Sequence, residues 1–489
     1  FLPVRRILGP FHRSSQRLDD ERVQQERNLP PLPTPWDGDD RWYRGGFPPR
    51  AHNKLTPLPH GDAYFKDLLE VLKTARRRVT IAVWCLTPLM DLANPQDSET
   101  FLLGEMLHQT SRHAEVLVLL WSGAPALFEP NVHYVKEVRR ILLGIAPEVG
   151  FQIDDRAAFS HDHHQKAVTV DGRVGYVGGI DLTTFQGNRW DTARHTLRFG
   201  PNWHDIQVRL EGEVVGDVEA NFCERWNAVT GRSDLRPLEP VVDESWNEPA
   251  QIVRTVPRGF YPFAPSGEYG IRHALLAGIR SAQRFIYLEN QYLWAPEIIE
   301  ALCERLNHAP DPFRITIVLP ADAYSGKYDN DRHVRLMRRA DAGRGRFEAY
   351  SLWTAGPASS RTGHQYRSIY VHAKVAIVDD AWFIAGSANL NMRGIATDTE
   401  MDVQAPAPEV ARRLRVQLWS EHLGMSEEEI SAADPIDLID NTWKQRATDM
   451  AAAVKRETAR PRGQILRYAA GRSVRDLLLD RFESATLEH

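Results

Sequence analysis

Cysteine is scarce in this chain: its 489 residues include only three, and Cys85, Cys223 and Cys303 lie far apart. An odd number at such spacing provides neither a disulfide framework nor a zinc-binding cysteine pattern. We therefore expect three small, buried, apolar side chains. Uninterrupted apolar runs of the roughly 18 residues needed to cross a bilayer are also missing. The sequence predicts no transmembrane segment and leaves secretion open.

Strong positive charge is lacking as well. The chain has 60 Lys and Arg against 65 Asp and Glu, which gives a formal net charge of −5. Domains that coat nucleic acid are usually strongly basic, so no nucleic-acid partner is expected. Lysine itself is rare, at nine of the 60 basic residues. Two of the nine occupy a repeated motif, which suggests that a compact point charge is required there.

That motif is His-x-Lys-x-x-x-x-Asp, and it occurs at His164, Lys166 and Asp171 and again at His372, Lys374 and Asp379. On a strand, the His and Lys share one face while the Asp points to the other. Such a set suits a phosphodiester: lysines neutralise its oxygens, one imidazole attacks phosphorus, and the other protonates the departing alkoxide. Because the lysines supply the positive charge, we expect no metal and no other cofactor.

The chain around the motifs consists of two similar halves, and His372 lies 208 residues after His164. Each half has a helix, a strand, a second helix and a second, continuous apolar strand before the motif. These are Tyr64–Arg77, Val79–Trp84, Thr100–His113 and Val116–Leu120, then Tyr269–Arg284, Phe285–Glu289, Pro296–Asn307 and Ile315–Leu319. A helix bearing Trp226 or Trp419 closes each half. The pattern predicts an α/β fold of two similar lobes, with mixed sheets flanked by helices, from an internal duplication.

The predicted boundaries follow from composition. We expect a partly disordered N-terminal arm over 1–55, lobes over 56–235 and 236–425, and a helical extension over 426–489, of which 487–489 resemble a tag remnant. Residues from about Thr230 to Pro257 are rich in Pro, Glu and Asp and are interpreted as the connection between lobes.

Further acidic residues are candidates to support the histidines. Asp191 lies 27 residues after His164 and Glu400 lies 28 after His372. A carboxylate on one imidazole nitrogen would determine which tautomer faces phosphorus. Asp171 and Asp379 are open between a supporting role and a purely structural one in hairpin turns. The run His161 to His164 is not interpreted as a metal cluster, because neighbouring strand residues point to opposite faces.

Several segments resemble the phospholipase D superfamily, in particular its true phospholipase D branch. The resemblance covers roughly residues 60–425 and depends on the segments 163–166, 178–182, 203–205, 289–292, 371–374 and 386–389. It implies hydrolysis of the terminal phosphodiester of glycerophospholipids to phosphatidic acid and a head-group alcohol. It also implies exchange of that alcohol for another, called transphosphatidylation.

By the same resemblance, His164 would be the nucleophile that forms a phosphohistidine, and His372 the general acid and base. Lys166, Lys374 and Asn389 would bind the phosphoryl oxygens. The first lobe carries Asp181 where the family has Asn, so Asp181 is not assigned to phosphate binding. Gln291, Trp190 and His204 are the candidate substrate-binding residues, although the segment 203–205 is equally compatible with joining the lobes.

The expected partner is a phospholipid at a membrane or micelle surface, bound by a monomeric enzyme. Alternatives keep the chemistry and change the substrate: a phosphodiesterase acting on nucleic acid, or a phospholipid synthase. A lipid-binding protein without catalysis is a further alternative, which two intact motifs disfavour.

Overall fold

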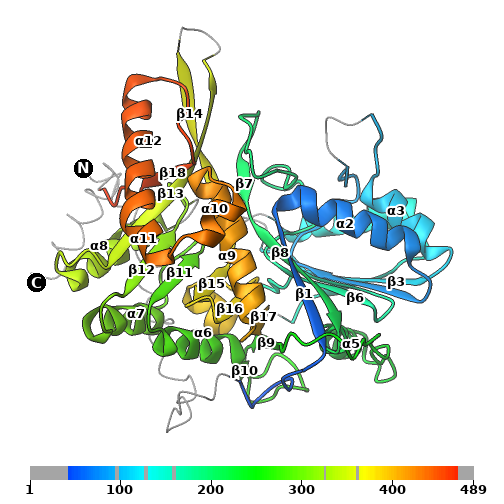
Figure 1. Ribbon diagram of the computed structural model, residues 1–489. Helices are drawn as coiled ribbons and strands as arrows, with labels where there is room; N and C mark the ends of the chain where they lie inside the picture. Colours follow the sequence, from blue (N-terminus) through cyan, green and yellow to red (C-terminus); the bar gives the residue numbers. More distant parts are fainter. Residues whose placement is uncertain are drawn as a thin grey trace, which may run out of the picture.

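The computed structural model describes residues 42–93, 98–125, 130–156, 161–323, 326–358 and 363–471. Two sheets lie side by side, and helices cover both faces of each (Figure 1). The predicted α/β fold is confirmed. Most of the predicted arm, and the whole of 487–489, lie outside the described residues. Among the described residues, no helix combines the length and hydropathy needed to cross a bilayer.

The first lobe contains a seven-stranded mixed sheet in the order β1-β8-β6-β5-β2-β3-β4. Its strands are β1 (Asn53–Pro59), β2 (Arg78–Val83), β3 (Glu115–Trp121), β4 (Gly150–Asp154), β5 (Ala167–Val170), β6 (Val174–Gly178) and β8 (Ile206–Gly212). The helices are α2 (His60–Thr74), α3 (Leu103–Ser111), α4 (Val132–Ile145) and α5 (Val214–Thr230). In Figure 1, α2 and α3 cover one face of this sheet and α5 covers the other. The central strands are buried on both faces, as their continuous apolar sequences require.

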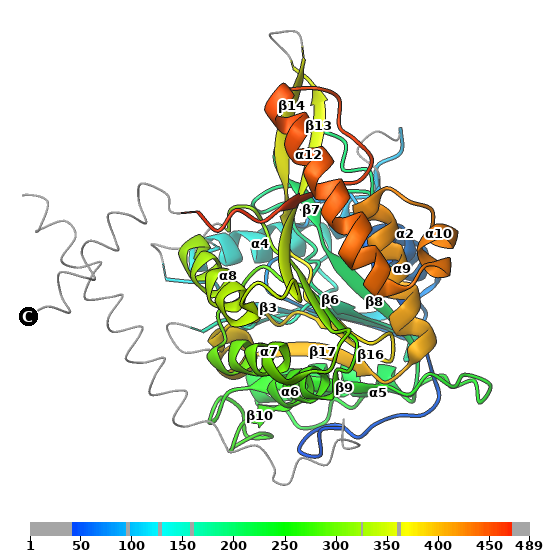
Figure 2. The same cartoon turned by 60° about the vertical axis from the view of Figure 1, so that its left-hand side comes forward.

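The second lobe repeats this arrangement around an eleven-stranded sheet. Its own strands are β9 (Gln251–Val256), β10 (Glu268–Tyr269), β11 (Phe285–Glu289), β12 (Arg314–Val318), β13 (Phe347–Pro357), β14 (His364–Val371), β15 (Val375–Val378), β16 (Trp382–Gly386), β17 (Glu400–Ala405) and β18 (Ile465–Arg467). The helices are α6 (Gly270–Ser281), α7 (Pro296–His308), α8 (Lys327–Asp341), α9 (Pro408–Leu423), α10 (Glu427–Ala432), α11 (Pro435–Asp437) and α12 (Lys444–Arg456), with π-helical turns η1 (Arg393–Thr397) and η2 (Leu438–Trp443). The hairpin of β13 and β14 projects from the body, with α12 beside it (Figure 2).

One strand of the second sheet comes from the first half of the chain. β7 (Asn202–His204) pairs in parallel with β14, in the register Tyr370↔Trp203 and Val371↔His204. A single hydrophobic cluster also contains side chains of both lobes, among them Val208 of β8 and Trp419 of α9. The lobes therefore share a core and a sheet edge, and do not form independent units.

The predicted elements agree with the structure to within a few residues, and β11 agrees in full. Several expectations differ. The extension over 426–489 was expected to be helical, but Ile465–Arg467 form β18, which pairs with β13. The motif His and Lys were placed on a strand, but β5 and β15 each begin at the residue after the Lys. The connection was expected to extend to Pro257, but β9 already begins at Gln251, where it pairs with β17.

The motif aspartates hold equivalent turns. Asp171 has a φ of 59° and Asp379 a φ of 55°. The carboxylate of Asp171 accepts hydrogen bonds from the backbone N–H groups of Arg76, Arg77 and Arg78, at 2.7–3.0 Å. That of Asp379 accepts from Gln283, Arg284 and Phe285, at 2.6–2.8 Å. Each Asp thereby connects a hairpin turn to the residues that lead into the neighbouring strand, β2 or β11. The turn lies at the opposite end of β5 or β15 from the motif His.

Candidate active site

The two motif histidines are held by carboxylates of the opposite lobe. Nδ1 of His164, in the first lobe, lies 2.9 Å from Oε1 of Glu400 on β17 of the second. Nδ1 of His372, in the second lobe, lies 2.7 Å from Oδ2 of Asp205, just before β8 of the first. Both imidazoles are therefore at the junction of the lobes, and their side chains keep 12% and 11% of their surface exposed.

Sheet register shows that these carboxylates are equivalent. Gly178, at the end of β6, pairs with Gln207, and Gly386, at the end of β16, pairs with Asp402. Asp205 and Glu400 each lie two residues before that partner. The duplicated lobes have therefore exchanged their orienting carboxylates, each serving the other lobe's histidine.

The orienting role predicted for Asp191 is wrong. Its carboxylate lies 3.1 Å from Nδ1 of His195 and accepts hydrogen bonds from the Asn202 amide and the Trp203 backbone. The loop between β6 and β8 in the first lobe is longer than the loop between β16 and β17 in the second. Residues at nearly equal distances along the sequence from the two motif histidines, such as Asp191 and Glu400, are therefore not structurally equivalent. Asp205 was visible in the sequence only as part of the 203–205 segment.

The motif lysines adopt matching conformations. Nζ of Lys166 donates to the backbone oxygen of His164 at 2.6 Å, and Nζ of Lys374 donates to that of His372 at 2.5 Å. Their other neighbours differ. Lys166 lies 3.4 Å from a carboxylate oxygen of Asp181, the residue that departs from the family pattern, whereas Lys374 lies 3.4 Å from Oε1 of Gln291. The nearest side-chain oxygen to the first-lobe ammonium thus belongs to a carboxylate, and that of the second belongs to a neutral amide.

Burial dominates the protonation of the site. Desolvation, with the Lys166 and Lys374 charges, lowers the pKa of His164 to about 3, while burial raises the pKa of Glu400 to about 8. Burial likewise lowers the pKa of His372 well below its usual value and raises that of Asp205 to about 7. Each pair therefore holds little net charge. A proton on Nδ1, facing the carboxylate, leaves Nε2 free to attack or to transfer a proton.

Of the remaining candidate residues, Asn389 and Gln291 have polar atoms near the motif lysines or without a described partner, whereas Trp190 lies on the core. Asn389 is 7% exposed, and its Oδ1 is buried with no hydrogen-bond partner among the described residues. Gln291 donates to the hydroxyl of Tyr370 at 2.7 Å and also contacts Lys374. Trp190, by contrast, packs on the hydrophobic core of the first lobe.

The expectation that the His204 side chain binds substrate is wrong, because the ring is fully buried. Its Nε2 lies 2.6 Å from Glu289 and its Nδ1 lies 3.3 Å from Glu421. The backbone of His204 does serve the site. Its carbonyl accepts hydrogen bonds from the amides of His372 and Ala373, at 2.8 and 3.1 Å.

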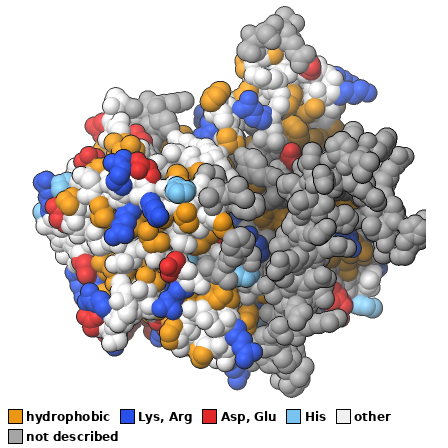
Figure 3. Space-filling view, turned by 180° about the vertical axis from the view of Figure 1, so that it is seen from behind, with side chains coloured by type: hydrophobic (Ala, Val, Ile, Leu, Met, Phe, Trp, Pro, Cys, Tyr) orange, Lys and Arg blue, Asp and Glu red, His pale blue; other side chains and the backbone are white. Residues whose placement is uncertain are grey.

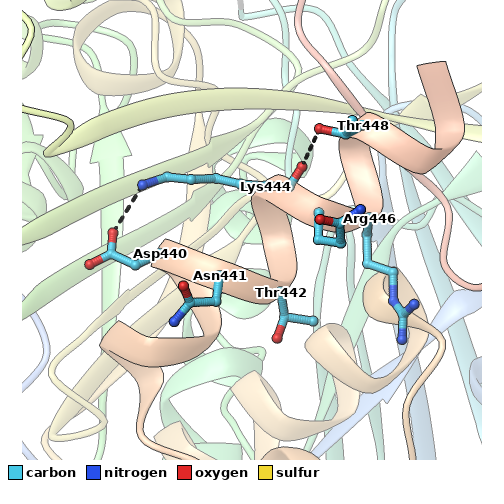
Figure 4. A pocket seen from close by; sticks show the side chains of 7 residues that line it. Asp440, Asn441, Thr442, Lys444, Arg446 and Thr448 are labelled. Atoms are coloured by element: carbon cyan, nitrogen blue, oxygen red, sulfur yellow. Dashed lines mark hydrogen bonds and ion pairs between the residues drawn. The ribbon is translucent and has the colours of Figure 1, made fainter. Parts of the chain in front are cut away.

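A surface hollow away from the motif residues contains none of the paired His and Lys side chains. It lies beside η2 and α12 and is lined by residues that include Asp440, Lys444 and Thr448 (Figure 4). Lys444 lies 3.2 Å from Asp440, and the Thr448 hydroxyl donates to the Lys444 carbonyl. No motif residue lines this hollow, so we assign no chemistry to it.

Comparison with known proteins agrees with the geometry. Residues 275–421 match the family described as "Cardiolipin synthase, PLD-like domain". The sequence is 25% identical to phospholipase D alpha 1 of Carica papaya, covering 88% of this chain and 73% of that one. It is 24% identical to phospholipase D alpha 4 of Arabidopsis thaliana, covering 79% and 68%.

Among solved structures, the fold resembles the phosphatidylserine synthase of Haemophilus influenzae Rd KW20, with a TM-score of 0.56 and 13% identity over 96% of this chain and 98% of that one. A duplicated α/β fold with paired His and Lys motifs at the junction defines the class of protein. By its family match and its curated relatives, the chain is similar to members of the phospholipase D superfamily.

Proposed function

We propose that the protein is a phospholipase D, which hydrolyses the terminal phosphodiester of glycerophospholipids and transfers the phosphatidyl group to alcohols. The observation that carries the proposal is the reciprocal pairing of Glu400 with His164 and of Asp205 with His372. Two oriented imidazoles and two lysine ammonium groups meet the requirements of a double displacement at phosphorus.

In the first step, Nε2 of His164 attacks phosphorus and the bond from phosphorus to the head-group oxygen breaks. Nε2 of His372 gives its proton to the departing alkoxide. An anionic phosphodiester favours the protonated form of His372, because a nearby negative charge stabilises imidazolium. The product of this step is a phosphohistidine on His164 and a free head-group alcohol.

In the second step, His372 acts as the base. It takes a proton from water or from an alcohol, whose oxygen attacks phosphorus and breaks the bond to Nε2 of His164. Water gives phosphatidic acid, and an alcohol gives a new phospholipid. Lys166 and Lys374 stabilise the charge on the phosphoryl oxygens in both steps.

Features of the surface support a lipid substrate. Phe199 is fully exposed, at 104% of its reference area. Its loop is nevertheless anchored, because Arg198 bonds to the carbonyls of Asn188 and Pro201, and Arg367 of the β14 hairpin bonds to those of Arg198 and Gly200. An anchored loop that presents an aromatic ring suits contact with the apolar part of a membrane or micelle.

A nucleic-acid substrate has less support. On the face shown in Figure 3, basic and acidic side chains are interspersed over the described surface. A protein that tracks a phosphate backbone would instead present a continuous basic band.

The test is head-group release from phosphatidylcholine vesicles. We expect His164→Ala and His372→Ala each to lower kcat at least about 1000-fold, a loss in the range for removal of a nucleophile or an acid and base. His133→Ala, on the exposed side of α4, is the matched control and should retain wild-type activity. Addition of a primary alcohol should yield the transferred phospholipid. Full activity in either active-site variant, or cleavage of single-stranded DNA without phospholipid turnover, would refute the proposal.

A further inference from the structure

A buried cluster of imidazoles and carboxylates lies behind the active site, and the mechanism above uses none of its side chains. It consists of His60, His195, His204, His422, Glu289 and Glu421. The four rings are at most 2% exposed. Three of the imidazoles come from the first lobe, and Glu421 lies near the end of α9 in the second. Such a group is costly to bury unless its charges and hydrogen bonds are compensated.

Three imidazole nitrogens converge on the Glu421 carboxylate. Nε2 of His60 lies 2.6 Å from Oε2, Nε2 of His195 lies 3.1 Å from Oε1, and Nδ1 of His204 lies 3.3 Å from Oε1. The four ligand atoms all lie within 4.8 Å of one another. In a tetrahedral zinc site with bonds of about 2.0–2.1 Å, ligand atoms are about 3.3 Å apart. The three distances from the imidazole nitrogens to Glu421, 2.6–3.3 Å, are near that value, and the nitrogens would need to move closer together around an ion.

The rings themselves are arranged as around a common ion. The centroid of His60 lies 4.8 Å from that of His195 and 5.1 Å from that of His204, and the last two are 5.9 Å apart. The ring planes are inclined to one another by 59–87°. Three imidazoles on one tetrahedral zinc ion would have centroids about 5 Å apart. Nδ1 of His204, which points at Glu421, has no hydrogen-bond partner among the described residues.

Carboxylates also lie beside the outer ring nitrogens of two of these histidines. Nδ1 of His195 lies 3.1 Å from Asp191, and Nε2 of His204 lies 2.6 Å from Glu289. Histidines that bind a metal through one nitrogen almost always donate the other N–H to a carboxylate, carbonyl or water. His204 therefore has the hydrogen-bonded outer partner that a metal site requires, and His195 has a carboxylate at ion-pair distance.

Charge balance points the same way. Asp191, Glu289 and Glu421 bring three negative charges into this region, and Arg198, 3.5 Å from Asp191, offsets one of them. Arg460 adds positive charge that interacts with Glu421, and a divalent cation would offset the remaining negative charge while leaving the imidazoles neutral. Without a cation, that balance would need protonated imidazoles with centroids about 5 Å apart, which would repel one another.

We propose that His60, His195, His204 and Glu421 form a structural zinc site that joins the two lobes, with Asp191 and Glu289 as outer-shell carboxylates. Four protein ligands leave no open position, as in structural and not catalytic zinc sites. Because the ligands are buried, the ion binds during folding. The site also acts on catalysis from outside it, since the His204 carbonyl holds the His372 backbone and the next residue, Asp205, holds the His372 ring.

The test is the metal content of the full chain, prepared without a polyhistidine tag because such a tag binds zinc itself. Mass spectrometry of the purified protein should find about one zinc per chain. His60→Ala and Glu421→Gln should lower this below about 0.2. His273→Gln, which changes a buried histidine of α6, is the matched control and should retain the metal.

A second measurement needs no variant. Removal of zinc from the wild-type protein with a strong chelator should lower Tm by at least about 5 °C, and readdition of zinc should restore it. Cobalt in its place should show the visible absorption of a tetrahedral site. Less than 0.1 zinc per chain after growth with zinc, with no change in Tm on zinc addition, would overturn the site. Full zinc in the His60 and Glu421 variants would overturn its ligands.

Discussion

Glu400 of the second lobe lies 2.9 Å from Nδ1 of His164 in the first. The relation is reciprocal, because Asp205 of the first lobe holds His372 of the second. Neither half of the duplication is thus a complete site. Each contributes a histidine that the other half orients, and the chemistry depends on how the lobes are docked.

Replacing an orienting carboxylate should therefore impair the histidine of the other lobe. We expect Glu400→Gln to lower kcat by about 100-fold to 10,000-fold, because an amide no longer selects the Nδ1–H tautomer of His164. Rapid quenching should show slower formation of the phosphohistidine. Glu409→Gln, an exposed change on α9, is the control. Unchanged phosphohistidine formation in Glu400→Gln would contradict the orienting role.

The pH dependence should report Lys374. Burial, opposed by Asp205, lowers its pKa to about 7 in the free enzyme. Lys374 is charged below that value and neutral above it, so its attraction for an anionic phosphodiester declines as pH rises through about 7. We expect KM to increase over this range in steady-state assays. In Lys374→Arg, where the charge persists, KM should be higher overall but should not follow this titration. A flat KM in the wild-type protein would contradict the assignment.

The acidic neighbour of the other lysine should weaken substrate binding. Asp181→Asn keeps an oxygen for the amides of Trp84 and Cys85 but removes the negative charge 3.4 Å from Lys166. We expect KM, and the inhibition constant of inorganic phosphate, to fall roughly threefold to tenfold, which corresponds to about 1 kcal/mol. An unchanged or higher inhibition constant would show that Asp181 does not attenuate the Lys166 charge.

The motif aspartates should matter for stability and not for chemistry. Asp171→Ala and Asp379→Ala each remove an acceptor of three backbone hydrogen bonds at a residue with positive φ. We expect the free energy of unfolding to fall by roughly 2–4 kcal/mol in each, at about 1 kcal/mol per hydrogen bond. Urea unfolding measures this change. The folded fraction should keep kcat within about twofold of wild type, and a loss of kcat without a loss of stability would favour a catalytic role.

Local sequence accounts for much of the fold. The apolar run Phe285–Glu289 is β11 as predicted, because five consecutive residues buried on both faces leave little choice of structure. The Pro at the start of α7 and the amphipathic spacing after it likewise specify that helix. The same reasoning failed for the connection, where β9 derives its order from pairing with β17 and not from its own composition.

By itself, the sequence determined the duplicated α/β fold and the set of two histidines and two lysines that suits chemistry on a phosphodiester. Residue types and their repeated spacing carry that information. Only the tertiary structure decided which carboxylate serves which histidine, that Asp205 and not Asp191 does so, and that His204 faces Glu421 and not the substrate. These contacts join residues up to 236 positions apart across the lobe junction. Their partners are selected by sheet register and docking of the lobes, which no local pattern records.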